Sequence, residues 1–311
     1  MLHDVGKIYT TVFEEDGDWH SPHHAPKGSR VARELMFKEF GIGGSKSFIE
    51  FREAVCLLIR YHSFPPHALD QYKGVLKLHK IASNSLLTPK FSLKLLYILS
   101  KADVLGRKSD DTKEMLDEVE LFKEFAIEEE CYEASYKFKS EHSRRAFLLG
   151  KDMWKDDDLY DDTWGEVVIM SGIPGSGKDR FINDYLSHLP MVSLDEIRKE
   201  KNISPTDNQG VVANIAREQA KEYLRSHTPF VWNATNLTEQ MRESVVGMCE
   251  TYKARVRINY IEASSWEQLL SQNRDRKEIV PQNVIENMLK KLVPPYVNEA
   301  EIVEWWVRNK N

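Results

Sequence analysis

The sequence predicts two domains, an all-α domain followed by an α/β domain with a parallel sheet. With 311 residues, the chain is too long for one ordinary domain and long enough for two hydrophobic cores. Apolar residues recur at helical spacing in the first half, whereas short apolar runs alternate with helical stretches in the second. An acidic segment separates these two patterns. We therefore expect a first domain at residues 1–150, a linker at 151–163 and a second domain at 164–311.

The composition is that of a globular protein. Hydrophobic residues make up 41% of the chain and charged residues 30%, with a mean hydropathy of -0.51. No apolar run reaches the length of a membrane span and no secretory leader is visible, so we predict a cytoplasmic protein. The three cysteines are far apart, which argues against a disulfide framework or a structural zinc. Because the formal net charge is -6, any nucleic acid must be held by a few local cations.

The first half carries the helical repeat in three segments, RVARELMFKEF, FREAVCLLIRY and LKLLYILSKAD. From Ser29 to about Phe138 the apolar positions show no convincing alternation of period two, so we expect helices throughout. The stretch KDMWKDDDLYDD at residues 151–162 then has the acidic composition of a solvated linker.

The second half contains three apolar runs that predict buried strands, GEVVIMSG (165–172), PFVWNATN (229–236) and VRINYIE (256–262). Helical stretches such as DRFINDYLSHL and QGVVANIAREQAKEYLRSH lie between them. The order β, α, β, α, β favours a parallel sheet with helices on its faces.

A glycine-rich segment fits the pattern G-x-x-x-x-G-K between the first predicted strand and a predicted helix. Glycines allow backbone N–H groups to surround phosphate oxygens, and the helix N-terminus adds positive potential. Lys178 can reach the β and γ phosphates of a nucleotide. The residues expected to bind it are Gly172, Pro174, Gly175, Ser176, Gly177 and Lys178.

Asp179 follows this lysine at a position where most such loops carry Ser or Thr, whose hydroxyl binds Mg²⁺. A carboxylate can also ligate Mg²⁺ or hold one of its waters. An acidic side chain is equally favoured at a helix N-terminus by the helix dipole, so both interpretations stay open.

Two polar groups are candidates for the acceptor side of the site. Asp195 and Arg198 lie three residues apart at the predicted start of a helix, where the carboxylate can accept a proton from an attacking hydroxyl. The guanidinium can hold an acceptor phosphate, although an ordinary surface pair has the same spacing. Asn233, Thr235 and Asn236 end a predicted strand, where α/β folds place functional loops, but they also suit a helix cap.

Arg274 and Arg276 lie in the segment NRDRKE, just before Val280, Pro281 and a predicted helix. Phosphoryl transfer needs positive charge over the γ-phosphoryl group, which a mobile segment with two arginines would supply. The alternative is a solvated run of charges.

These motifs, over residues 165–298, resemble the kinase domain of polynucleotide kinases, which move the γ-phosphate of ATP to a 5′-hydroxyl end. That family has an Asp-x-x-Arg motif after the second strand, a (D/N)-x-T-N strand end and a helical lid with arginines before Val-Pro. The resemblance implies ATP and Mg²⁺ as cofactors, Asp195 as general base and Arg198 on the acceptor's phosphate. It also implies that Arg274 and Arg276 close over the γ-phosphoryl group.

The first half carries imidazole and carboxylate groups that together suit a divalent transition metal or Mg²⁺. Residues from several helices can converge on one ion, whereas a lone histidine at a helix end usually caps it or is solvated. The candidate ligands are His3, Asp4, His24, His62 and Asp103.

The motifs H-D-V-G-K, H-x-x-x-G, L-I-R-Y-H and K-A-D-x-x-G-R, over residues 2–107, resemble the HD superfamily of metal-dependent phosphohydrolases. These motifs are similar in sequence to those of the HD domain appended to tRNA nucleotidyltransferases. The resemblance implies His3, Asp4 and Asp103 as metal ligands. It implies His24 and His62 as further ligands or phosphate contacts.

The same resemblance implies Lys7 and Arg107 as phosphate contacts. Members of the superfamily have another histidine ligand on an earlier helix. We therefore expect the natural translation start to lie upstream of Met1, the alternative being a site that has lost its first ligand.

An HD module ahead of a polynucleotide kinase module resembles bacterial bifunctional end-healing enzymes, which combine a 5′-OH kinase with a 2′,3′-phosphatase. The resemblance implies RNA (or DNA) 5′-OH and 2′,3′-phosphate ends as substrates and an RNA ligase in the same pathway. Two alternatives stay open. One is a small-molecule or nucleoside kinase with an HD scaffold, and the other is a non-catalytic, ATP-gated binding module.

Overall fold

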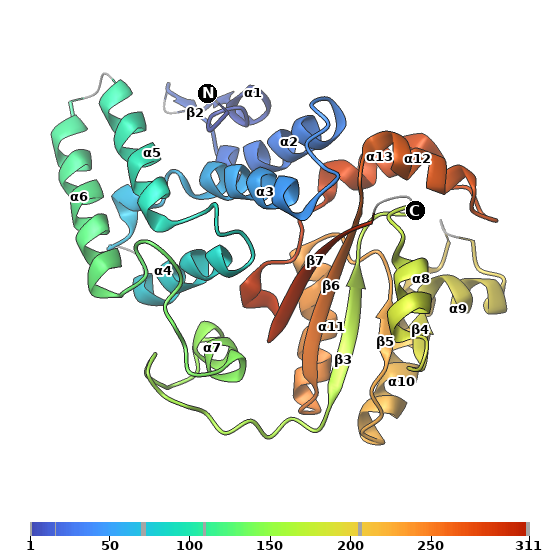
Figure 1. The fold of residues 1–311 in the computed structure, drawn as a ribbon. Helices are drawn as coiled ribbons and strands as arrows, with labels where there is room; N and C mark the ends of the chain where they lie inside the picture. The colour runs from blue at the N-terminus through green and yellow to red at the C-terminus, as the bar shows by residue number, and fades with distance from the viewer. Residues whose placement is uncertain (1, 16, 70–72, 108–109, 205–206, 309–311) are drawn as a thin grey trace. The chain divides into compact units, whose positions relative to one another are not determined.

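The computed structural model describes residues 2–15, 17–69, 73–107, 110–204 and 207–308 (Figure 1). Its internal contacts divide the chain into two compact units. Unit 1 comprises Met1–Lys139 and Ala146–Asp157, and unit 2 comprises Ser140–Arg145 and Asp158–Asn311. The segment expected as a linker is thus divided between the two units at residue 157. None of the helices within the described residues combines the length and the apolarity needed to cross a bilayer.

Unit 1 consists of helices and one small hairpin, in which β1 (Val12–Phe13) pairs antiparallel with β2 (Trp19–His20). Helices form across the region where the apolar spacing predicts them. The expectation of an all-α domain is wrong at residues 12–20, because strands of two residues are too short to show an alternating pattern. The helices are α1 (Lys7–Thr10), α2 (His24–Lys38), α3 (Lys46–Tyr61), α4 (Gly74–Ala82), α5 (Leu93–Gly106), α6 (Thr112–Glu128) and the end of α7 (Glu141–Leu148).

Helices α2 and α3 pack against each other in unit 1. The Ser45 hydroxyl accepts a hydrogen bond from the Phe48 N–H at 3.2 Å and thereby caps the start of α3. The facing sides of the two helices share a buried apolar cluster of Ala32, Met36, Cys56 and Ile59. Burial of this cluster fixes α2, which begins at His24, against α3, which ends beside His62.

Gly6 allows the start of the chain to lie directly against α2. A Cβ atom at this position would be 1.9 Å from the carbonyl oxygen of His24 and 2.7 Å from the backbone nitrogen of Gly28. No side chain fits there, so the glycine is a requirement of close backbone approach. It brings His3 and Asp4, which precede it, to the beginning of α2.

Unit 2 is built on a five-stranded, wholly parallel sheet in the order β4-β5-β3-β6-β7 (Figure 1). The three predicted strands correspond to β3, β5 and β6, so the predicted parallel sheet is confirmed. The other two strands, β4 and β7, were not predicted. The bounds are β3 Glu166–Ser171, β4 Met191–Ser193, β5 Val231–Asn233, β6 Arg255–Ala263 and β7 Ile302–Arg308.

Helices pack on this sheet over a large apolar core that includes Val167, Ile169, Ala216, Val246 and Ile258. The helix after β3 begins as α8 (Lys178–Phe181) and continues as a π-helical turn over Ile182–Leu186. The remaining helices are α9 (Leu194–Lys201), α10 (Gln209–Arg225), α11 (Glu239–Thr251), α12 (Trp266–Arg274) and α13 (Gln282–Lys291).

Candidate functional site

The glycine-rich loop between β3 and α8 has the backbone that its sequence predicts. Gly172, Gly175 and Gly177 have φ angles of 145°, 83° and 97°, which L side chains rarely adopt. A Cβ atom would lie 2.4 Å from the carbonyl oxygen of Ile261 at Gly172, and 2.7 Å from that of Leu269 at Gly175. The loop therefore packs against β6 and α12 so closely that only glycine fits.

Lys178, the first residue of α8, lies on the inner side of this loop. Its Nζ donates hydrogen bonds to the carbonyl oxygens of Gly172 at 2.7 Å and Ile173 at 3.3 Å. Burial lowers the pKa of Lys178 to about 8, with the nearby charges of Asp179 and Arg276 acting in opposite directions. The ammonium is thus poorly solvated, and an anion bound at the loop would stabilise it.

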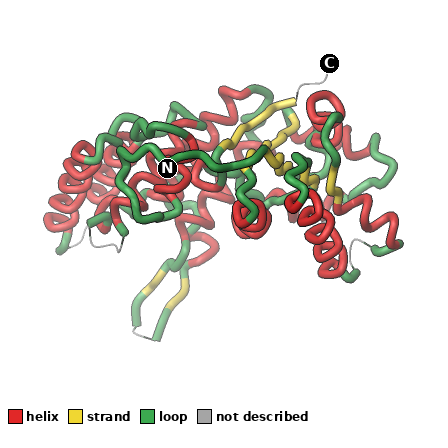
Figure 2. Tube along the Cα trace, turned by 90° about the horizontal axis from the view of Figure 1, so that it is seen from below, coloured by secondary structure: helices red, strands yellow, loops and turns green. Residues whose placement is uncertain are grey.

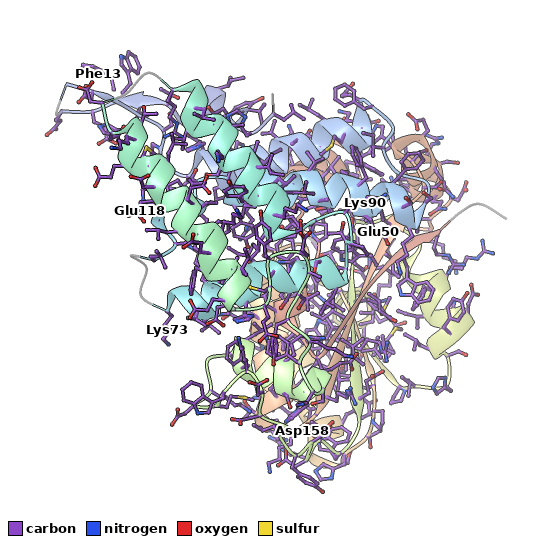
Figure 3. The ribbon with its side chains drawn as sticks, turned by 60° about the vertical axis from the view of Figure 1, so that its left-hand side comes forward. Phe13, Glu50, Lys73, Lys90, Glu118 and Asp158 are labelled. Atoms are coloured by element: carbon purple, nitrogen blue, oxygen red, sulfur yellow. The ribbon has the colours of Figure 1, made fainter. Side chains whose placement is uncertain are left out.

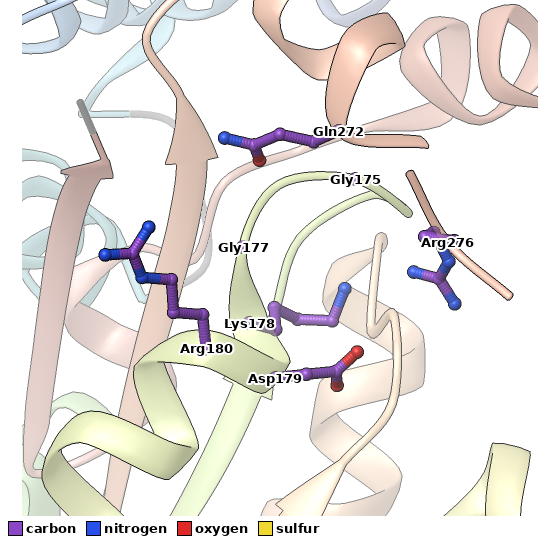
Figure 4. A pocket seen from close by; sticks show the side chains of 7 residues that line it. All are labelled: Gly175, Gly177, Lys178, Asp179, Arg180, Gln272 and Arg276. Carbon is purple, nitrogen blue, oxygen red and sulfur yellow. The ribbon is translucent and has the colours of Figure 1, made fainter. Parts of the chain in front are cut away.

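A cavity of about 150 Å³ opens at the loop (Figure 4). In this view Lys178 and Asp179 point toward Arg276, whereas Arg180 extends to the opposite side of the loop. The buried hydroxyl of Ser176 has no hydrogen-bond partner among the described residues. The lining residues are Gly175, Gly177, Lys178, Asp179, Arg180, Gln272 and Arg276.

Asp179, on α8, and Asn233, at the end of β5, lie side by side. The Asn233 amide donates to Asp179 Oδ1 at 2.9 Å, which fixes the carboxylate beside Lys178. Carboxylate and amide oxygens are among the ligands that Mg²⁺ prefers, so Asp179 and Asn233 fit this cation.

Thr235 and Asn236 contact the backbone that supports the loop. The Thr235 carbonyl accepts a hydrogen bond from the Gly172 N–H at 2.9 Å. The buried Asn236 amide donates to the Met170 carbonyl at 2.7 Å, and its own carbonyl accepts from Ser171 Oγ at 3.0 Å. These contacts hold β3 and the segment after β5 together, so both residues support the loop from outside the cavity.

Asp195 lies between two of the predicted arginines at the start of α9. Its Oδ1 accepts a hydrogen bond from Arg198 at 2.5 Å, and its Oδ2 lies 3.9 Å from Nη2 of Arg276. Arg198 is fixed further by its Nε, which donates to the Gln209 side chain at 2.9 Å. The structure therefore brings Asp195, Arg198, Arg276 and Lys178 into one neighbourhood.

The segment that carries Arg274 and Arg276 is closed by a pair of hydrogen bonds. The Asn273 amide donates to the Val280 carbonyl at 2.8 Å, and the Val280 N–H donates to the Asn273 side chain at 3.1 Å. Arg276 lines the cavity, whereas Arg274 is an exposed residue at the end of α12.

In unit 1 the structure brings all five predicted metal ligands together. His3, Asp4 and Asp103 form one group of possible ligand atoms, and Asp4, His24 and His62 form a second. His3 Nε2 lies 3.2 Å from Asp103 Oδ1. Asp4 Oδ1 lies 3.7 Å from Nε2 of both His24 and His62.

The hydrogen bonds of the two inner histidines leave their Nε2 atoms directed at each other. His24 Nδ1 lies 2.8 Å from the Ser21 carbonyl and His62 Nδ1 lies 2.8 Å from the Ile59 carbonyl, so each Nδ1 is the protonated donor. The two Nε2 atoms are 3.3 Å apart, and the Ser63 hydroxyl lies 3.2 Å from Nε2 of His62 and can donate to it. A cation at this position would take the place of that hydroxyl and accept the lone pairs of both nitrogens.

Asp4 Oδ1 gives a second test of whether the cluster fits a metal. This atom is buried and has no hydrogen-bond partner among the described residues. Ligand atoms about 2.1 Å from one ion lie roughly 3 to 3.5 Å from one another, close to the spacings of this cluster. The residues therefore fit a divalent cation.

The charge and burial of these residues also favour the binding of a divalent cation. Burial lowers the pKa of His62, although its bond to Ile59 opposes the change, and this favours the neutral imidazole that metals bind. Partial burial acts to raise the pKa of Asp4, but the hydrogen bond and charge of Lys7 outweigh it, so the pKa is lowered. Lys7 lies 2.8 Å from Asp4 Oδ2, and Arg107 donates to Asp103 at 2.5 Å.

The comparisons with known proteins bear on unit 2. A family model described as an AAA domain matches residues 167–295. A solved structure of a candidate kinase from Chloroflexus aurantiacus is 12% identical, with a TM-score of 0.39 over 47% of this chain and 89% of that one. A search of curated proteins gave no significant match. The family match covers the glycine-rich loop, strands β4, β5 and β6 and nearly all of β3, and it ends before β7. Unit 2 is a P-loop α/β domain.

The P-loop domain contributes site residues that the sequence patterns did not identify. Arg180 and Gln272 line the cavity, and Asn273 closes the arginine segment beside it. Arg180 lies two residues after Lys178, a spacing that does not place two helical side chains on one face, so no signal in the sequence indicated it. Gln272 and Asn273 carry no signal either, because their positions depend on how α12 packs against the loop.

Proposed function

We propose that the P-loop domain is an ATP-dependent kinase that phosphorylates 5′-hydroxyl ends of polynucleotides. One observation carries the proposal: a carboxylate, Asp195, is held between Arg198 and Arg276 beside the loop that contains Lys178. A phosphoryl-transfer site needs a base for the attacking hydroxyl and cations around the phosphoryl group.

In the proposed reaction the 5′-oxygen forms a bond to the γ-phosphorus of ATP as the bond to the β–γ bridging oxygen breaks, and ADP leaves. Asp195 accepts the proton of the attacking hydroxyl. Lys178 and the loop amides hold the β and γ phosphates, and Arg276 neutralises the charge that develops on the transferred group. Arg274 belongs to the same segment and would approach the γ-phosphoryl group when that segment moves over the cavity.

Two further contacts complete the proposed site. Asp179 and Asn233 would hold Mg²⁺, which would supply positive charge to the nucleotide phosphates. Arg198 would bind the phosphate that follows the first nucleoside of the acceptor. The polynucleotide acceptor is supported by the motif order that resembles the polynucleotide kinases and by the position of Arg198 next to Asp195.

The acceptor is tested by comparing γ-phosphate transfer to a 5′-OH oligoribonucleotide, the same oligodeoxyribonucleotide, a 3′-mononucleotide and a free nucleoside. We expect efficient transfer only where a phosphate follows the first nucleoside, because Arg198 needs it. Equal transfer to free nucleosides would instead identify a small-molecule kinase. ATP binding without transfer to any hydroxyl would identify a nucleotide-gated binding module.

We propose a second activity, metal-dependent removal of 2′,3′-phosphates, for unit 1. The buried, unpartnered Asp4 Oδ1 between His24 and His62 carries this proposal. The five ligands would hold a divalent transition metal or Mg²⁺, which supplies Lewis-acid polarisation of the phosphoryl group. Lys7 and Arg107, each paired with a carboxylate of the cluster, would bind phosphate oxygens.

Metal binding is measured directly, by titration of the full chain with Mn²⁺ and by thermal unfolding with and without it. We expect Mn²⁺ to raise the Tm of the wild type and not that of Asp4→Asn. The matched control is His67→Gln, since His67 is exposed and outside the cluster. Equal stabilisation of wild type and Asp4→Asn would contradict the metal site.

A further inference from the structure

The hairpin of unit 1 and the helix α1 that precedes it carry exposed apolar side chains. Tyr9 is 60% exposed, Phe13 60% and Trp19 71%, and the neighbouring Ile8 and Val12 are exposed as well. Figure 2 shows the hairpin standing out from the helices, and Figure 3 shows Phe13 at the margin of the unit. Large apolar side chains that cluster in solvent usually mark a binding surface. We call Tyr9, Phe13 and Trp19 the aromatic hairpin surface.

Both ends of the hairpin lie next to the proposed metal ligands, which we call the histidine–aspartate cluster: His3, Asp4, His24, His62 and Asp103. The first strand follows α1, which begins at Lys7, three residues after the ligand Asp4. After the second strand, the Ser21 carbonyl contacts the ring of the ligand His24 at 2.8 Å. Thr11 Oγ1 and Ser21 Oγ are 2.8 Å apart and close the base of the hairpin. The hairpin is therefore an insertion between two ligand groups of one site.

Two of the exposed rings contact each other, and the third is paired with a cation. Phe13 and Trp19 lie side by side, with centroids 5.2 Å apart and planes inclined at 59°. The Nζ of Lys27 lies 5.0 Å from the centroid of the Tyr9 ring. Such a combination of exposed rings and a cation is what binds single-stranded nucleic acid, since every base presents a flat face for stacking.

The charges around the hairpin indicate where a strand would lie. Lys7 and Lys27 are at its base, near the cluster, whereas Glu14, Glu15 and Asp18 are at its far end. The acidic end would repel a phosphate backbone, so phosphates are favoured only toward the cluster. This polarity disfavours a membrane surface, where an acidic tip beside exposed rings would be repelled by anionic lipids.

We propose that the aromatic hairpin surface stacks the last bases of a single-stranded RNA whose 3′-terminal phosphate enters the histidine–aspartate cluster. The inference rests on the phosphohydrolase proposed for unit 1 and specifies its substrate as an oligonucleotide end. A mononucleotide would reach the cluster without the contacts that the hairpin supplies.

The test compares Trp19→Ala and Phe13→Ala with Trp154→Ala in the full chain. Trp154 is a tryptophan of unit 1 outside the hairpin that is at least as exposed as Trp19, and it serves as the matched control. With Mn²⁺, we expect KM for an oligoribonucleotide carrying a 2′,3′-cyclic phosphate to rise about tenfold in each hairpin variant. The preference for this substrate over a 2′,3′-cyclic mononucleotide should fall by the same factor. Trp19→Phe, which keeps a ring, should retain most of the preference.

A binding measurement separates this inference from the phosphohydrolase itself. An oligoribonucleotide with a 3′-phosphate and a fluorophore blocking its 5′-end is titrated by anisotropy. If no phosphate is released but Trp19→Ala weakens binding and Trp154→Ala does not, the hairpin contact stands and the phosphohydrolase fails. If phosphate is released yet neither hairpin variant alters KM or binding, the inference is overturned. It is also overturned if Trp19→Ala changes only self-association or vesicle binding.

Discussion

At the scale of single residues, the P-loop domain depends most on the carboxylate of Asp195. Arg198 lies 2.5 Å from its Oδ1 and Arg276 lies 3.9 Å from its Oδ2, so each oxygen of this carboxylate faces a cation. We expect Asp195→Asn to lower kcat by roughly a hundredfold to ten-thousandfold, the range for loss of a general base. ATP affinity should change little, because Lys178 and the loop remain.

The control for this prediction is Glu200→Gln on the same helix, which removes an exposed carboxylate outside the cavity. Transfer of labelled γ-phosphate to a 5′-OH oligonucleotide and equilibrium ATP binding are measured for both variants. Transfer by Asp195→Asn at the wild-type rate would exclude this residue as the base.

The lowered pKa of Lys178 predicts how nucleotide binding depends on pH. Burial lowers its pKa to about 8, so the lysine is protonated below that pH and neutral above it. Bound phosphates favour the protonated form, so affinity is highest below pH 8 and declines as the pH rises further. ATP should bind about tenfold more weakly at pH 9 than at pH 7. In Lys178→Arg the dependence should disappear, and a slope unchanged by that substitution would assign the titration to another group.

At the scale of elements, the packing of α1 on α2 fixes the histidine–aspartate cluster. Gly6→Ala would place a methyl group 1.9 Å from the carbonyl oxygen of His24, so the backbone must shift and separate the two sets of ligands. We expect this variant to lose stabilisation by Mn²⁺ and phosphate release, together with part of its stability. Gly106→Ala is the matched control, because a Cβ there meets nothing within 4 Å. Tm with and without Mn²⁺ distinguishes the two, and full Mn²⁺ stabilisation of Gly6→Ala would contradict the packing argument.

The elements also show what the sequence could and could not predict. Strands β3 and β6 were predictable because their apolar runs are long and almost wholly buried, and β5 because it begins within the apolar run PFVW. Strand β4 has three residues that run directly into the charged segment LDEIRKE, and β7 carries charged residues among its apolar ones, so neither presents a clear pattern. The hairpin was missed because its strands are exposed and have two residues each. In the site, motifs identified residues whose spacing is local, whereas Gln272 and Asn273 depend on tertiary packing.

The segment at residues 140–145 also depends on tertiary contacts that the sequence could not predict. Arg145 donates to Glu250 at 2.7 Å, and Arg144 donates to the Glu301 carbonyl at 2.5 Å. These partners are more than a hundred residues away along the chain, so no local composition could assign the segment to unit 2. The acidic stretch at residues 151–162 indicated a domain boundary only because it separates the helical pattern of the first half from the strand pattern of the second.

At the scale of the whole molecule, the net charge of -6 limits how nucleic acid can be bound. The proposed contacts use a few cations at each end-binding site and no continuous basic surface. For single strands each phosphate contact contributes about -0.7 to the slope of log K against log salt, so we expect a slope no steeper than about -2. Anisotropy titrations of a 5′-OH oligonucleotide at several salt concentrations measure it. A much steeper slope would indicate an extended electrostatic contact.

The two units also predict how the two proposed activities respond to substitution. Each unit has a core of its own, and the residues of each proposed site come from one unit alone. Lys178→Ala should therefore abolish 5′-phosphorylation and leave 3′-phosphate removal intact, and Asp4→Ala should do the reverse. Both ends of one RNA, with a 5′-OH and a 2′,3′-cyclic phosphate, are analysed after incubation with ATP and Mn²⁺. Wild type should give a 5′-phosphate and a 3′-OH, the ends that an RNA ligase joins. If either substitution removed both activities while the protein remained folded, the two sites would be coupled and not independent.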